Sequence, residues 1–314
     1  MHFMRVLLTG GAGFLGSHFL DQLIARNHEP VLILRKETDP WRIAEKIKGI
    51  KIIYSDLRNL KEIEELILEF APEAVVNIAW QGVSGNERNR PEQIQLNWEW
   101  NQVLLETAQQ SGCRTWIGIG SQAEYGPLNR AITEEAVTEP STLYGITKLM
   151  VCHFSRFFCR TNGMRWVWLR LFSSYGPRDS PDWLIPYLIR NLLKSTHPTL
   201  TKGEQLWDFL YIRDAAAAVI QCLECEKANG IYNLGSGKTL PLRSMVEMLH
   251  KMINPKLELR FGEIPYRPDQ VMHLEADITR LKRDTQWKPE TALEQGLRET
   301  IEWFRSHDEG SHDR

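Results

Sequence analysis

Short strand patterns and amphipathic helix patterns alternate from the first residues of the chain, and this alternation restricts the fold more than any other feature. The first strand pattern covers residues 5–9 and is followed by a glycine turn and a helix pattern with Phe19, Leu20, Leu23 and Ile24 on one face. Consecutive strand–helix–strand units form right-handed crossovers, which place parallel strands in one sheet with helices on both faces. We therefore expect an α/β protein built on a doubly wound parallel sheet.

The same rhythm continues along the chain and then changes. Further strands are expected at residues 31–34, 51–54, 74–79, 115–120, 165–171 and 231–234, with helices at 60–70, 93–110, from about 141, and around 293–304. Beyond residue 175, segments marked by proline and glycine interrupt the pattern. We expect residues 1–175 and about 208–240 to form a dinucleotide-binding (Rossmann) domain. Residues of about 176–207 and 241–314 are expected to form a smaller C-terminal α+β lobe that binds the substrate.

Composition limits the class of partner. The 314 residues include 38 Lys plus Arg and 40 Asp plus Glu, a formal net charge of −2, so no global charge favours nucleic acid or a membrane surface. No apolar run approaches the roughly 20 residues of a membrane-spanning helix, and no secretory signal pattern precedes the first strand. The five cysteines lack a framework spacing, so we expect a cytoplasmic protein with reduced thiols. Cys222 and Cys225 form a C-x-x-C pair without a second Cys or His pair, which favours packing over zinc, and no metal site is expected.

A glycine cluster lies between the first strand pattern and the first helix pattern. Gly10, Gly13 and Gly16 permit a tight turn, close approach of the backbone to a pyrophosphate and close packing of the helix. The start of the helix offers free N–H groups and the positive end of the helix dipole. In this strand–turn–helix context the cluster predicts a dinucleotide-binding turn rather than a purely structural one.

The residues after the second strand pattern indicate which dinucleotide binds. An acidic residue at that point accepts a hydrogen bond from the adenosine ribose of NAD, whereas this chain has Arg35 and Lys36. Each cation can add a charge-assisted hydrogen bond of about 1.5–3 kcal/mol to a ribose 2′-phosphate. We therefore expect NADP(H) in preference to NAD(H), the alternative being two solvated loop charges. Asp56, after the third strand pattern, is placed to accept a hydrogen bond from the adenine amino group.

A tyrosine and a lysine stand four residues apart at the start of an expected helix. Tyr144 and Lys148 therefore lie on one helical face, where the ammonium can approach both the phenol and a bound ribose. A nearby positive charge favours the phenolate and draws the tyrosine pKa towards the range of a general acid or base. Ser121 ends a strand pattern at the carboxyl edge of the sheet, where it can polarise a substrate carbonyl. We expect these three side chains to be catalytic.

These ordered motifs resemble the extended short-chain dehydrogenase/reductases, in particular the NAD-dependent epimerase/dehydratase family of nucleotide-sugar enzymes. The resemblance covers Gly10, Gly13, Gly16, Asp56, residues 77–79, Ser121, residues 125–126, Tyr144, Lys148, and residues 169–172, 175–177, 207–212 and 233–235. It implies an NAD(P)-dependent enzyme in which Tyr144 is the general acid or base, and a homodimer packed through the helix that contains this tyrosine. Further cofactor contacts are implied at Phe14, Leu15, Leu57 and Ala79.

Two departures from the family pattern narrow the reaction. Members that resemble sugar 4,6-dehydratases have Asp-Glu directly after the Ser or Thr, whereas this chain has Gln122 and Ala123. Members that resemble the GDP-fucose-forming epimerase-reductase have a Cys two residues after the Ser, where Ala123 cannot act as an acid or base. Hydride transfer with Tyr144 as the proton donor remains.

Two reactions fit hydride transfer: one-way reduction by NADPH of the 4-keto group of a nucleotide-activated (6-deoxy)sugar, and NAD-dependent 4-epimerisation through a transient ketone. Arg35 and Lys36 favour the reduction. Residues 265–271 and 276–281, which resemble C-terminal segments of 3,6-dideoxy- and 6-deoxyhexose synthases, favour it as well. A non-catalytic NADP-binding regulator is a remote alternative, because such relatives typically lose the Tyr or the Lys. The nucleotide, whether UDP, dTDP, CDP or GDP, stays open.

The substrate diphosphate needs cations from the second lobe. Arg267, flanked by prolines that fix its loop, is expected to bind it, with Arg178 as the second choice. Trp207 occupies a slot where many relatives have an Arg before Asp-Phe, and it can either stack on a base or pack in the core. Other expected contacts with the sugar are Trp80, Gln122, Ser173, Ser174 and Trp183.

Overall fold

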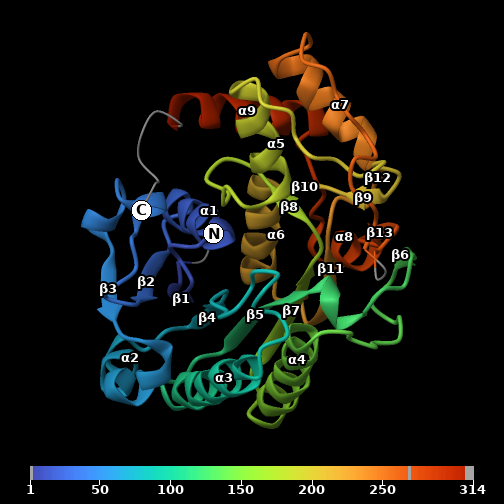
Figure 1. The fold of residues 1–314 in the computed structure, drawn as a ribbon. Helices are drawn as coiled ribbons and strands as arrows, with labels where there is room; N and C mark the ends of the chain where they lie inside the picture. Colours follow the sequence, from blue (N-terminus) through green and yellow to red (C-terminus); the bar gives the residue numbers. More distant parts are fainter. Residues whose placement is uncertain (1–2, 268–269, 308–314) are drawn as a thin grey trace.

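The computed structural model describes residues 3–267 and 270–307, and its frame is a seven-stranded parallel sheet (Figure 1). In spatial order the strands are β11 (Gly230–Leu234), β7 (Arg165–Leu171), β5 (Thr115–Ser121), β4 (Ala74–Asn77), β1 (Arg5–Thr9), β2 (Glu29–Leu34) and β3 (Lys51–Tyr54). Strand order reverses between β1 and β4, so the chain winds outwards in both directions from this point. The doubly wound α/β prediction is confirmed, and the reversal leaves a crevice at the carboxyl edge of the sheet, where such folds bind ligands.

Helices cover both faces of this sheet. The helices α1 (Phe14–Ala25) and α6 (Ile212–Glu224) pack with one apolar cluster, and α2 (Glu64–Phe70), α3 (Glu92–Gln110) and α4 (Leu143–Thr161) pack with the other. All four residues of β4 and all seven of β5 are buried, as expected for central strands covered on both faces. These buried strands hold their carboxyl ends in fixed positions.

A second lobe packs against the carboxyl edge of the sheet. Its helices are α5 (Leu184–Leu193), α7 (Leu242–Ile253), α8 (Thr279–Thr285) and α9 (Leu293–His307). Its strands are β6 (Arg130–Ile132), β9 (Leu206–Asp208), β12 (Thr239–Pro241) and β13 (His273–Ala276) in one sheet, and β8 (Ser174–Tyr175) paired with β10 (Leu210–Tyr211). A third apolar cluster joins α5, α7 and α9. The chain returns to the main sheet as β11, which pairs with β7 along its whole length.

Two details differ from the sequence expectations. The segment β6, expected within the dinucleotide-binding part, pairs in parallel with β13 of the second lobe. The expected helix at 60–70 divides into a 3₁₀ segment, Leu57–Ile63, and the short helix α2, because the backbone at Ile63 leaves the helical region, with φ −117° and ψ 5°. By contrast, the strands expected at 51–54 and 165–171 agree to the residue. Long-range pairing and local backbone kinks leave no periodic trace in a sequence.

Residues 3–267 and 270–307 contain no helix that is long and apolar enough to cross a membrane. In the same residues, no group of three or more His, Cys, Asp and Glu side chains is arranged to hold a metal ion. All five cysteines are free thiols. Burial raises the pKa of Cys222 to about 12, and the thiol of Cys225 faces the carbonyl oxygen of Asp284 at 3.3 Å, so both act as packing residues.

Candidate active site

The glycine turn after β1 forms the first part of the site. Gly10 has a φ of +72°, and a Cβ atom there would lie 2.7 Å from the amide nitrogen of Ala79. The amide of Gly13 donates to the carbonyl oxygen of Gly10 at 2.9 Å, and a Cβ on Gly16 would collide with the same oxygen. The helix α1 begins at Phe14 with no side chain capping its first turn. Its free N–H groups therefore offer an anion site with room for a close backbone approach.

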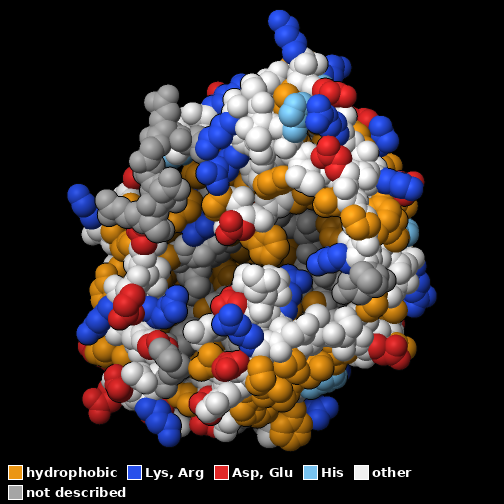
Figure 2. Space-filling view, in the orientation of Figure 1, with side chains coloured by type: hydrophobic (Ala, Val, Ile, Leu, Met, Phe, Trp, Pro, Cys, Tyr) orange, Lys and Arg blue, Asp and Glu red, His pale blue; other side chains and the backbone are white. Residues whose placement is uncertain are grey.

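A cavity of about 640 Å³ extends along the carboxyl edge of the sheet from this turn. The molecular surface is hollowed between the two lobes (Figure 2). Predicted site residues that line the cavity are Gly10, Gly13, Phe14, Leu15, Arg35, Asp56, Ala79, Trp80, Ser121, Tyr144, Lys148, Ser173, Ser174 and Trp183. The cavity thus joins the glycine turn to the expected catalytic side chains. The side chain of Leu57 lies outside what the structure describes.

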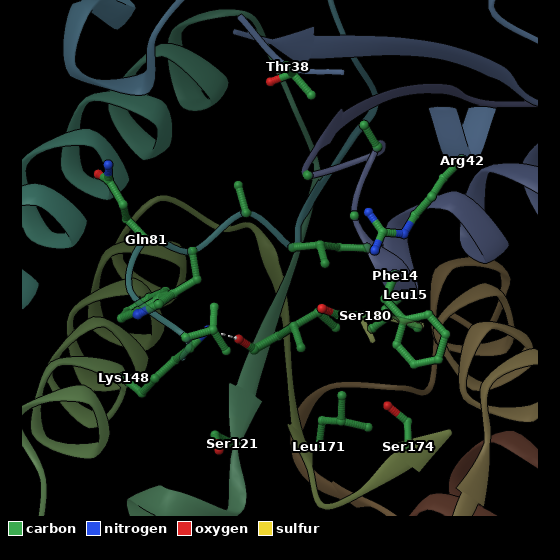
Figure 3. Close-up of a pocket in the computed structure, with 18 of the residues that line it drawn as sticks. Phe14, Leu15, Thr38, Arg42, Gln81, Ser121, Lys148, Leu171, Ser174 and Ser180 are labelled. Carbon is green, nitrogen blue, oxygen red and sulfur yellow. Dashed lines mark hydrogen bonds between the residues drawn. The ribbon is translucent and has the colours of Figure 1, made fainter. Parts of the chain in front are cut away.

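The catalytic end is built from β5 and α4. Ser121 ends β5, and its hydroxyl accepts from the amide of Ala123 at 3.2 Å. Thr142 caps α4, accepting from the amide of Gly145 at 3.1 Å, and one turn of helix then separates Tyr144 from Lys148. In Figure 3, Lys148 and Ser121 lie at one end of the cavity, opposite Thr38 and Arg42. The expected constellation therefore comes together.

Burial shifts the pKa values of Lys148 and Tyr144 in opposite directions. Burial lowers the pKa of Lys148 to about 7, against the raising effect of Glu124. The ammonium nitrogen donates to the carbonyl oxygen of Ile119 at 2.6 Å, drawn as the dashed line in Figure 3, and lies 3.7 Å from the centre of the Trp80 ring. Burial raises the pKa of Tyr144, although a hydrogen bond with Ser121 lowers it. Tyr144 is therefore protonated at neutral pH and suited to donate a proton.

A buried glutamate, which the sequence analysis missed, positions Ser121. One oxygen of Glu124 accepts from the amide of Ser121 at 2.9 Å and from the indole of Trp168 at 3.0 Å. The other accepts from the guanidinium of Arg170 at 2.7 Å. Ser121 and Glu124 form a capping box, and the Ser-x-x-Glu spacing is a readable signal for it.

The opposite end of the cavity contains two arginines, of which the sequence predicted one. Arg35 and Asp56 line it as expected, together with Thr38 and Arg42, which the sequence analysis missed. The guanidinium carbon of Arg42 lies 4.2 Å from the centre of the Trp41 ring. Lys36 is exposed and does not line the cavity. The position of Arg42 in the sequence, well after the end of β2, did not indicate this contact, because a short 3₁₀ turn at Trp41–Ile43 brings Arg42 back to the cavity.

Arg178, expected to bind the substrate diphosphate, does not line either cavity and is held against α1 instead. Its guanidinium donates to Asp21 at 2.6 Å and lies 2.9 Å from a ring nitrogen of His18. Its neighbour Asp179 lines the main cavity, where burial raises the carboxyl pKa to about 7 against the lowering effect of Arg42. The ion pair with Asp21 was invisible in the sequence because the two residues are 157 positions apart.

Other residues expected to contact substrate divide between two hollows and the surface. A second cavity of about 230 Å³ is lined by Trp207 together with residues of α5, α7 and the 261–270 segment. Trp183 lines the first cavity and the next residue, Leu184, lines the second, so the two adjoin at the start of α5. Gln122 and the exposed Arg267 line neither cavity. Gln81, which was not among the predicted site residues, lines the first cavity.

Comparisons with known proteins agree with this arrangement. Residues 6–235 match the family model described as the NAD dependent epimerase/dehydratase family. A dTDP-glucose 4,6-dehydratase of Salmonella typhimurium is 27% identical over 96% of this chain and 92% of that protein. The UDP-glucose 4-epimerase of Thermotoga maritima, solved with UDP-glucose, superposes with a TM-score of 0.89 at 25% identity, over 98% of this chain and 100% of the other. The UDP-glucose 4-epimerase of Thermus thermophilus, solved with NAD, gives a TM-score of 0.83 at 26% identity, over 97% and 100%.

Proposed function

The chain belongs to the NAD-dependent epimerase/dehydratase family of nucleotide-sugar enzymes, and we propose that it is a cytoplasmic, NADPH-dependent reductase of the 4-keto group of a nucleotide-activated 6-deoxysugar. The observation behind the proposal is that Tyr144, Lys148 and Ser121 line one end of a cavity that the glycine turn also lines. Five free thiols agree with a reducing compartment.

The residues present fit a nicotinamide dinucleotide. Gly10 and Gly16 leave space that any Cβ atom would fill, and the uncapped start of α1 offers N–H groups for a pyrophosphate. Gly13 and the residues Phe14 and Leu15 would lie along it, and Ala79 would lie beside the same turn. When bound, the reduced cofactor supplies hydride to the carbonyl carbon of the sugar.

The chain's own side chains supply the rest of the reaction. Ser121 polarises the carbonyl by donating a hydrogen bond to its oxygen, and Tyr144 gives its phenolic proton to that oxygen as the alcohol forms. Lys148, with a pKa of about 7, can return a proton to the tyrosine. Gln122 and Ala123 provide no carboxylate for loss of water, which argues against a dehydratase.

Cofactor preference rests on the cations beyond β2. Arg35 and Arg42 line the cavity where the adenosine ribose would lie, and no acidic residue directly follows β2. A 2′-phosphate would therefore form ion pairs with these arginines, which a neutral ribose hydroxyl cannot. Asp56 lines the same end and would accept from the adenine amino group.

The second cavity would hold the substrate's base. Trp207 offers an indole face there. The second cavity adjoins the main cavity at Trp183, and a base bound in it would place the sugar near Tyr144. Arg267 is exposed and lines neither cavity, so its contact with the diphosphate would require its side chain to change position. A homodimer through α3 and α4 would bury the outer face of α4, where Phe157 is 60% and Ile146 42% exposed.

A second candidate is an NAD-dependent 4-epimerase. It is favoured by the fold likeness to two UDP-glucose 4-epimerases, one of them solved with NAD. The same tyrosine would then remove a proton before returning it, and the ketone would be transient.

Parallel assays decide between the two candidates. Oxidation of NADPH and of NADH is followed against nucleotide-4-keto-6-deoxy sugars with UDP, dTDP, CDP and GDP. We expect turnover that prefers NADPH and falls about 10²–10⁴-fold in Tyr144→Phe, while Tyr54→Phe, an exposed tyrosine outside the cavity, keeps full activity. Interconversion of C4 epimers with no consumption of either cofactor would refute the reductase and favour the epimerase.

A further inference from the structure

Arg88 places a positive charge at the catalytic end of the main cavity. It belongs to the loop between β4 and α3 and lines the cavity with Trp80 and Val83. Its Nε donates to the carbonyl oxygen of Val83 at 3.0 Å, and this bond does not involve the two terminal amino groups of the guanidinium. Within residues 3–267 and 270–307, no ion pair joins Arg88 to a carboxylate. Its guanidinium carbon lies 5.1 Å from the centre of the Tyr144 ring.

The backbone fixes this arrangement. The amide of Tyr144 donates to the carbonyl oxygen of Arg88 at 2.8 Å, so the loop and the start of α4 are joined directly. Gln93 donates to the carbonyl oxygen of Glu87 at 3.2 Å and also to that of Gly82. The loop is therefore tied to α3 at Gly82 and Glu87 and to α4 at Arg88, and the Arg88 side chain is half-buried.

Several groups act on the phenol of Tyr144, and they differ in whether they titrate. Ser121 hydrogen-bonds to it, while the negative charge of Glu124 opposes its ionisation, although that charge is paired with Arg170. Lys148 has a pKa of about 7, and its ammonium is directed to Ile119 and Trp80. A lysine of this kind loses charge near neutral pH, whereas an arginine remains charged at any pH the protein tolerates.

We propose that Arg88 is a positioning residue whose permanent charge stabilises the phenolate of Tyr144 after the tyrosine has donated its proton. The inference rests on the proposed role of Tyr144 as proton donor. In that step hydride from the reduced nicotinamide forms the new C–H bond, and the carbonyl π electrons move to oxygen. The O–H bond of Tyr144 breaks as the sugar O–H bond forms. Its electron pair stays on the phenolic oxygen of the ring beside Arg88 until Lys148 or solvent returns a proton.

A substrate-free titration tests the inference. Ionisation of Tyr144 is followed by the ultraviolet absorbance of phenolate in the full chain, as the difference between the wild type and Tyr144→Phe. In the Arg88→Gln background, the same difference is measured between Arg88→Gln and the double variant Arg88→Gln with Tyr144→Phe. Both comparisons are repeated with NADP⁺ bound. For a half-buried charge 5.1 Å from the ring, the loss of Arg88 should raise the phenol pKa by about one unit. Arg88→Lys should stay near the wild type, as should Arg90→Gln, an exposed arginine of the same loop outside the cavity.

Turnover gives a second readout that a purely structural role would not move. Reduction needs the protonated tyrosine, so kcat falls as the pH rises through the Tyr144 pKa. In Arg88→Gln this limb should move to higher pH by the same shift, with an unchanged KM for the sugar nucleotide.

Three results would overturn the inference: an unchanged Tyr144 titration in folded Arg88→Gln, a lysine variant that behaves like the glutamine variant, or a wild-type Tyr144 that does not ionise before the protein unfolds. If Arg88→Gln does not fold, Arg88→Met takes its place as a neutral side chain of similar length. A shifted titration with no turnover on any keto sugar would refute the proposed function and leave the inference standing.

Discussion

Replacing Glu124 by glutamine should destabilise the protein strongly, because the substitution leaves a buried guanidinium without its counter-ion. Glu124 is 0% and Arg170 only 2% exposed, and their closest atoms are 2.7 Å apart. Glutamine keeps an oxygen to accept from the amide of Ser121 and the indole of Trp168, so the main loss is charge. Removing one partner of a buried ion pair typically costs about 3–5 kcal/mol in the free energy of unfolding.

The cost can be measured by urea unfolding followed by tryptophan fluorescence, with the free energy of unfolding extrapolated to water. The matched control is Glu294→Gln, which breaks an i, i+4 pair with Arg298 whose side chains are 57% and 65% exposed. That change should cost no more than about 0.5 kcal/mol.

A double variant separates charge from packing. Combining Glu124→Gln with Arg170→Met removes both charges and should recover part of the lost stability, because no uncompensated ion remains. A Glu124→Gln protein within about 1 kcal/mol of the wild type would refute the reasoning, since it would mean that Arg170 needs no buried counter-ion.

Local features of the fold give three other predictions. Gly10→Ala should lower the free energy of unfolding by about 1–3 kcal/mol and weaken NADPH binding, because φ is +72° and the new Cβ would meet the Ala79 backbone. The control is Gly85→Ala, with nothing near its Cβ, and equal affinities of the two variants for NADPH by fluorescence titration would contradict the prediction. Burial lowers the pKa of His18 from 6.5 to about 4, so its contribution to stability is complete above pH 6.5 and is lost as the pH falls towards 4. The urea midpoint of unfolding should therefore fall less over this pH range in His18→Gln than in the wild type, and an equal fall in both proteins would refute the prediction. Arg35→Gln and Arg42→Gln should each raise the KM for NADPH about tenfold and leave that for NADH unchanged; equal effects on both cofactors would exclude contact with the 2′-phosphate.

Much of the frame could be predicted because its signals are local. Residues 165–171 form a strand at the predicted positions, because the run at residues 166–169 is entirely apolar, as expected for a strand covered on both faces of the sheet. The glycine turn and the pairing of Tyr144 with Lys148 were predicted because a tight turn and a shared helical face depend on spacing alone.

The remaining features depend on contacts between distant residues. Arg178 was expected to bind a phosphate, but Asp21 and His18 hold it against α1. Arg88 was not singled out, because only the folded loop brings it to Tyr144, 56 positions later in the chain. A charge in a loop has no periodicity to indicate which surface it will face.

The path of the chain between the sheet and the second lobe has a mechanical consequence. The segment β6 leaves one lobe to pair with β13 of the other, and β11 returns to the sheet after the second lobe has been entered. Two bodies joined by a single linker can rotate apart freely, whereas each further crossing of the chain restricts that rotation. Ligand entry should therefore depend more on small displacements of side chains that line the cavity, such as Trp183, than on a large change in the mutual orientation of the lobes.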